Sequence, residues 1–220
     1  MAVYLIIASA IGVIALIVLG NGWYNKKRRE AFTKIAEQLG VEIHFELPQE
    51  DWDRIERFDL YKSKGRKHTV DLAFVAQTDS TRITVCEYTI VVNTGKNSSS
   101  TTSIVLLVWD PRLDAPALSL QQKTWNASLS ASVSKWFGFQ FIEFPEDPEF
   151  QSRYLIRGES EEALRAFLTA ERREGLIRNS VPAFEACGDC LIVVHNNLRL
   201  QPYKIEDRFA EALAVLNSLV

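Results

Sequence analysis

The sequence predicts an α+β protein in which an N-terminal transmembrane helix precedes one domain with a mainly antiparallel sheet and packed helices. Three observations lead to this prediction. The first twenty residues are almost wholly apolar, several later segments alternate apolar and polar side chains as strands do, and others show helical spacing with helix-end signals. We divide the chain into an anchor at 2–24, a basic juxtamembrane helix at 25–40 and a domain at 41–220.

The anchor prediction rests on residues 2–20, which carry no charged side chain. The hydrocarbon core of a bilayer is about 30 Å thick, and roughly 20 apolar helical residues span it. A buried helix of a soluble protein normally shows a polar stripe, and this run shows none. Trp23 and Tyr24 follow, and such rings suit the headgroup level. We therefore expect a bilayer-spanning helix.

The orientation follows from four consecutive cations, Lys26, Lys27, Arg28 and Arg29, directly after the run. The cytoplasmic flanks of membrane spans carry an excess of lysine and arginine. This predicts a single-pass inner (plasma) membrane protein with its N-terminus outside and its C-terminal domain in the cytoplasm. A cleaved secretory signal is the alternative. It fits less well, because no basic segment precedes the apolar run and the run exceeds a usual signal core.

The distribution of charge along the chain indicates which kinds of binding partner the protein suits. The 220-residue chain has a net charge of −3, but residues 26–35 hold five cations and one anion. The remainder therefore holds 20 cations and 27 anions, a net of −7. An acidic domain is a poor match for a nucleic-acid partner. The four cations at 26–29, here called the basic collar, suit a lipid bilayer with anionic headgroups as the partner. Ala8 and Gly12 form a small-residue pair that can bring two membrane helices together, although small residues are common in any such helix, so a homodimer stays an open alternative.

The first half of the domain is expected to consist mainly of strands, because it is rich in β-branched and aromatic residues. The expected strands are 41–45, 58–63, 67–76, 81–92, 103–109 and 117–121, and the expected helices are 26–39 and 48–57. Residues 104–108 are apolar on both faces, which predicts a central buried strand. Residues 93–102 (NTGKNSSSTT) lack an apolar side chain, so we expect a flexible connection there.

The second half mixes helices with strands. Expected helices are 127–137, a helix from Ser160 to Arg173 that Gly175 ends, and 203–219; expected strands are 153–157, 183–187 and 190–195. The last two strands should form a hairpin around Gly188-Asp189. The acidic stretch 143–149 is expected to be a solvated loop, because its carboxylates lack the spacing of a calcium loop.

This order of elements has a counterpart. An apolar N-terminal span, then Phe58-Asp59-Leu60-Tyr61 with a glycine at 65, then Tyr154-Leu155-Ile156-Arg157-Gly158 before a helix, then a Gly-Asp hairpin and a closing helix, resembles a group of uncharacterised bacterial single-pass membrane proteins. The resemblance implies an anchor and a bacterial source. It implies no activity and no catalytic residues.

Cys187-Gly188-Asp189-Cys190 is the sharpest motif in the chain, since a C-x-x-C can be a redox pair or half of a zinc site. Flanking a hairpin turn, the two cysteines would lie opposite each other, about 5.5 Å apart at Cα. Reactive pairs usually open a helix, and the near neighbours Glu185 and Asp189 are anionic, so we expect small, inert thiols. A metal site would need further ligands, and we predict none; we expect no cofactor.

A second candidate site is a basic hairpin formed by Lys62, Lys64, Arg66 and Lys67. If it faces the bilayer, each cation would contribute about 1 kcal/mol of attraction to anionic headgroups. The alternative is a charged strand end that resists aggregation.

The chain shows no nucleophile elbow and no glycine-rich phosphate loop. We therefore expect a membrane-anchored cytoplasmic domain that is a non-enzymatic interaction or scaffold protein with an unidentified protein partner. A membrane-tethered thiol-redox or metal-binding protein using Cys187 and Cys190 is the alternative.

Overall fold

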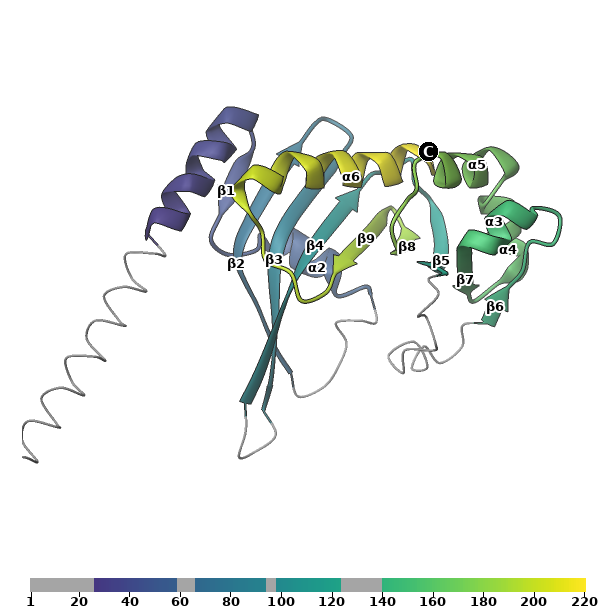
Figure 1. The fold of residues 1–220 in the computed structure, drawn as a ribbon, viewed down its shortest axis with the longest axis horizontal. Coiled ribbons are helices and arrows are strands. Elements are labelled where there is room, and N and C mark those ends of the chain that lie inside the picture. The colour runs from purple at the N-terminus through teal and green to yellow at the C-terminus, as the bar shows by residue number, and fades with distance from the viewer. Residues whose placement is uncertain (1–25, 59–65, 94–97, 124–139) are drawn as a thin grey trace, which may run out of the picture.

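A computed structural model describes residues 26–58, 66–93, 98–123 and 140–220 (Figure 1). No helix in these ranges is long and apolar enough to cross a membrane. The proposed span at 2–24, including Ala8, Gly12, Trp23 and Tyr24, lies outside the described residues. So do most of the expected strand 58–63 and the whole of the expected helix 127–137.

The described residues form an α+β fold built on one antiparallel sheet, as the sequence predicts (Figure 1). The sheet has nine strands in the order β1-β2-β3-β4-β9-β8-β5-β7-β6. Their bounds are β1 Glu42–His44, β2 Arg66–Gln77, β3 Arg82–Asn93, β4 Ser98–Trp109, β5 Ala115–Gln122, β6 Gln140–Ile142, β7 Tyr154–Gly158, β8 Phe184–Gly188 and β9 Cys190–His195.

Helices lie against both faces of this sheet. Besides a helix over residues 26–39 they are α2 Gln49–Ile55, α3 Pro148–Arg153, α4 Glu161–Phe167, α5 Ala170–Arg178, the 3-10 helix η3 Pro202–Lys204 and α6 Ile205–Asn217. Helix 26–39, α2 and the closing helix α6 confirm three sequence predictions.

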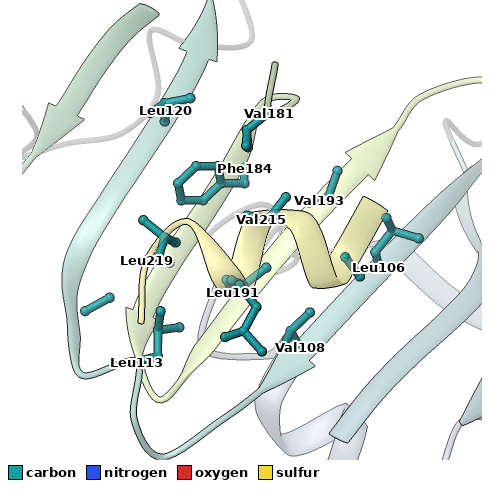
Figure 2. Packing of buried hydrophobic residues seen from close by; sticks show 14 of the residues in the cluster. Leu106, Val108, Leu113, Leu120, Val181, Phe184, Leu191, Val193, Val215 and Leu219 are labelled. Carbon is teal, nitrogen blue, oxygen red and sulfur yellow. The ribbon is translucent and has the colours of Figure 1, made fainter. Parts of the chain in front are cut away.

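Successive residues along a strand belong alternately to two separate hydrophobic clusters, one on each face of the sheet. On the first face, Leu106 and Val108 of β4 pack with Val193 of β9 and Val215 of α6 (Figure 2). On the opposite face, Val105 and Leu107 join a smaller cluster that includes Ile55 of α2. Residues 104–108 are all at most 3% exposed, which confirms the predicted central buried strand.

A buried ion pair fastens α2 to the sheet. Asp51 of α2 is fully buried, and its carboxylate accepts hydrogen bonds from the Arg82 Nε and Nη2 atoms, both at 3.0 Å. Thr84 Oγ1 donates to the same carboxylate at 2.9 Å. Buried charges persist when they are paired and hydrogen-bonded, and this carboxylate meets both conditions.

The expected single helix from Ser160 to Arg173 is wrong. Ser160 caps α4 as predicted, but α4 ends at Phe167 and a second helix begins after Thr169, whose hydroxyl accepts from the Arg172 amide. Arg173 is therefore near the start of α5, buried, with its Nε 2.8 Å from Asp147 Oδ2. Gly175 lies inside α5 and does not end a helix.

Two predicted loops contain regular secondary structure among their described residues. Residues 98–102 extend β4, because its backbone pairing with β3 continues to Asn93↔Ser98. These five residues are all serine or threonine, so the pairing there does not depend on apolar side chains of β4. The Thr89 Oγ1 and Thr102 Oγ1 atoms lie 2.9 Å apart across the two strands. The acidic stretch 143–149 contains the start of α3. Asp147 caps that helix by accepting from the Phe150 amide at 3.1 Å.

The glycine of the Tyr154–Gly158 motif has a packing role. A Cβ at Gly158 would lie 2.2 Å from Leu164 Cδ1 and 2.9 Å from the Ala117 carbonyl oxygen. Any side chain there would push α4 away from the sheet, so this part of the motif is structural.

Candidate functional site

The C-x-x-C motif forms the tight hairpin that the sequence predicts. Cys187 and Cys190 are directly paired across β8 and β9, and neither is in a disulfide. Gly188 has φ of +60°, as the first central residue of a type II′ turn requires. Asp189 accepts at 2.6 Å both from Trp109 Nε1 and from Arg57 Nη1. These bonds hold the turn against β4 and the end of α2.

Arg57 is a neighbour of the thiols that the sequence alone does not reveal. Its Nη1 lies 3.6 Å from Cys190 Sγ, although the two residues are 133 positions apart. Even so, burial and the Asp189 carboxylate raise the pKa of the Cys190 thiol to about 12. Burial also raises the pKa of the Cys86 thiol. A nucleophilic or redox cysteine needs an accessible thiolate, and Cys190 offers neither access nor thiolate.

Metal binding gains no support from this turn. Within the described ranges, no group of three or more histidine, cysteine, aspartate and glutamate side chains is placed to hold a metal ion. His195, which follows the motif, instead has its Nε2 3.1 Å from Glu211 Oε2 on α6.

Alkylation tests the inert thiols. At pH 7 we expect Cys190 to react with iodoacetamide at least about a hundredfold more slowly than free cysteine, because a thiol with a raised pKa is almost wholly protonated. Cys187 should react no faster than free cysteine. Mass spectrometry of the full-length protein in detergent measures each site, and urea-unfolded protein is the control. Rapid labelling of Cys190 in the folded protein would contradict this account.

The four cations after the predicted span belong to helix 26–39, which is packed into the domain. Phe32 and Ala36 are 1% and 2% exposed and belong to the larger hydrophobic cluster. The Phe32 ring meets the Phe74 ring of β2 edge-on, with centroids 5.6 Å apart. Lys26, Lys27 and Arg29 are exposed, whereas Arg28 points inward. The basic collar is therefore part of the folded domain.

Glu87 of β3 is the buried partner of this helix. Its side chain forms an ion pair with Arg28 Nη2, and the same carboxylate oxygen accepts from the Leu200 amide at 2.7 Å. Arg28 Nη2 also donates to the Leu200 carbonyl at 3.3 Å. One carboxylate thus joins helix 26–39, the sheet and the segment before η3.

The basic hairpin is described in part. Lys62 and Lys64 lie outside the described residues; Arg66 begins β2, and Lys67 is exposed. In Figure 1, β2 begins at the lower side of the molecule, and helix 26–39 also begins at its lower end.

A polar groove of about 380 Å³ opens between helix 26–39 and the sheet. Its walls come from helix 26–39, from strands β2, β3 and β4, and from Arg199 before η3. The floor carries the Arg28–Glu87 pair and the bonded hydroxyls of Thr89 and Thr102. These polar groups lie on the same face of the sheet as Leu106, which belongs to the larger hydrophobic cluster farther along β4.

A β-bulge lies at the edge of the groove. The pairing of β2 with β3 shifts register between Val70 and Leu72, which leaves Asp71 outside the regular ladder. Bulges re-aim a side chain and are enriched next to functional sites. Asp71 is exposed and lines the groove.

Sequence reasoning missed Asp71, Glu87 and Arg199 as a group. They come from three separate parts of the chain, and only the sheet pairing brings them together. One signal was available: Glu87 interrupts an otherwise apolar stretch of β3, and a charge in such a place needs a buried partner.

No protein-family model matches the chain, and no curated protein matches it. Among solved structures, the crystal structure of the mycobacterial trehalose monomycolate transport factor A, TtfA, is similar at a TM-score of 0.47 and 11% sequence identity. The match covers 87% of this chain and 90% of that chain. A likeness at this level carries no argument about function.

Proposed function

We propose that this protein is a single-pass protein of a bacterial inner membrane whose cytoplasmic domain is a non-enzymatic interaction module. The apolar run 2–20 and the cations at 26–29 support the anchor and its orientation. The observation that carries the proposal is that helix 26–39, which holds those cations, is built into the domain through Phe32 and Glu87.

This packing has a consequence for how the domain would sit on the bilayer. An α-helix rises about 1.5 Å per residue, so Phe32 lies roughly 9 Å along the axis from Lys26. That distance is close to the Debye length of about 8 Å at physiological ionic strength. Phe32 would therefore lie about one Debye length from Lys26, and the polar groove, which helix 26–39 helps to line, would lie on the part of the domain nearest the membrane.

The thiol alternative is disfavoured, because the Cys190 thiol is buried and its pKa is raised. The dimer suggested by Ala8 and Gly12 involves residues outside the described ranges and stays an open alternative. Binding of a protein or lipid ligand at the exposed polar surfaces is the function that the geometry supports best.

A topology experiment tests the proposal. A reporter active only in the cytoplasm, fused after Val220, should be fully active in bacterial cells, and a reporter active only outside the membrane should be inactive at the same site. The matched control replaces Lys26, Lys27, Arg28 and Arg29 by glutamine, which should reduce or invert the asymmetry because those cations direct orientation. Activity of the outside-only reporter in the native sequence would overturn the proposal.

A further inference from the structure

We propose that the groove between helix 26–39 and the sheet binds a phosphate ester whose phosphate is flanked by a hydrogen-bond donor, such as the ammonium of phosphoethanolamine. The inference rests on the proposed membrane anchoring only for the source of the ligand, a lipid headgroup or a soluble ester. The chemistry of the site rests on the groove itself.

The phosphate position is inferred from two arginines. Among the described residues, neither Arg29 nor Arg199 has a carboxylate within ion-pair distance, whereas Arg28 is neutralised by Glu87. The Arg29 guanidinium lies 4.4 Å from the centroid of the Phe45 ring, which limits its positions without using its donors. A guanidinium presents a planar fork of donors that suits phosphate oxygens.

The requirement for a neighbouring donor comes from Asp71. A carboxylate at the rim would repel a bare phosphate, so an anion alone is a poor match for the groove. Asp71 can accept only, and a ligand with an ammonium or hydroxyl group beside its phosphate satisfies it. The bulge that leaves Asp71 outside the ladder places this carboxylate at the groove.

The polar groups of the floor are already paired within the protein. Glu87 is satisfied by Arg28 and by the Leu200 amide, and the Thr89 and Thr102 hydroxyls bond each other. The groove therefore has a stable polar base, while its accessible charges, Arg29, Arg199 and Asp71, remain available. Two cations and one anion leave a net charge of +1, which favours a ligand carrying an anionic phosphate.

Isothermal titration of the full-length protein in an uncharged detergent tests the inference. The probes are phosphoethanolamine, inorganic phosphate and dihexanoyl phosphatidylethanolamine below its micelle concentration. We expect saturable binding of phosphoethanolamine, at least tenfold tighter than that of inorganic phosphate. Tighter binding of the short-chain lipid than of phosphoethanolamine identifies a lipid headgroup as the ligand; equal or weaker binding identifies a soluble ester.

Variants assign the binding to the groove. R29Q and R199Q should each weaken phosphoethanolamine binding at least tenfold, and D71N should remove the preference over inorganic phosphate. K34Q is the matched control, since Lys34 is an exposed cation on the same helix but does not line this groove. All four side chains are exposed, so unchanged melting temperatures are expected. Absence of saturable binding, or binding that R29Q and R199Q leave intact, would overturn the inference. Neither result depends on the topology reporters.

Discussion

Leu106→Asp should abolish the folded domain. Leu106 is 0% exposed in β4, at the centre of the sheet, and its side chain belongs to the larger hydrophobic cluster (Figure 2). The substitution removes about 2–3 kcal/mol of apolar burial. It also places a carboxylate without a partner in the core, which costs several kcal/mol more. The total approaches the whole free energy of unfolding of a typical domain, about 5–15 kcal/mol.

The native cysteines report this loss directly. Cys86 and Cys190 are 0% exposed, so both should become rapidly alkylated in the full-length L106D protein in detergent and stay protected in the wild type. Thr101→Asp is the matched control, because Thr101 is exposed in the same strand. If L106D protects both thiols as well as the wild type does, the position of Leu106 in the core is wrong.

Asp51→Ala should reduce the free energy of unfolding by about 1–3 kcal/mol, because it leaves buried donors of Arg82 and Thr84 without their acceptor. Arg82 is 6% exposed and would lose both hydrogen bonds to Asp51, while its Nη1 keeps the half-exposed Glu50 carboxylate at 2.8 Å. Urea denaturation of the full-length protein, followed by tryptophan fluorescence, measures the change in midpoint.

The control for this pair is Asp53→Ala on the same helix. Asp53 is exposed and, within the described ranges, its side chain accepts a single hydrogen bond, from Gln49 Nε2, so its loss should change stability by no more than about 0.5 kcal/mol. Equal midpoints for the Asp51 and Asp53 variants would show that the Asp51–Arg82 pair does not fasten α2 to the sheet.

Local patterns were sufficient to predict most strands and the closing helix. Residues 104–108 are apolar at every position, and a central strand buried on both faces places all of them out of water. The helix prediction from Ser160 to Arg173 was wrong because it relied on helical spacing and overlooked a second helix-start residue within the same stretch. The helical spacing after Ser160 continues through Thr169, but Thr169 is itself a good N-cap, and the chain uses it to start a second helix.

The candidate site was less predictable, because its parts are distant in the sequence. Arg57 lies beside Cys190 only because α2 packs near the β8–β9 turn, so charge counted along the chain missed it. The groove depends on the β2–β3 register shift at Asp71, and an exposed aspartate in a strand gives no sign of a bulge. Arg28 was predicted to be one of four equivalent collar cations, yet it alone among them is paired with the buried Glu87.

The central claim is that the basic helix after the predicted span is docked on the domain, and amide hydrogen exchange tests it most directly. Full-length protein in lipid nanodiscs, analysed by mass spectrometry, should show residues 30–39 protected in wild type, because Phe32 and Ala36 lie in the core. Glu87→Ala, a change on β3, should accelerate exchange of this helix at least tenfold while leaving α5 unchanged, because Glu87 bonds Arg28. Fast exchange of residues 30–39 in the wild type, or the same rate in both proteins, would contradict the docked helix and the membrane-anchored function built on it.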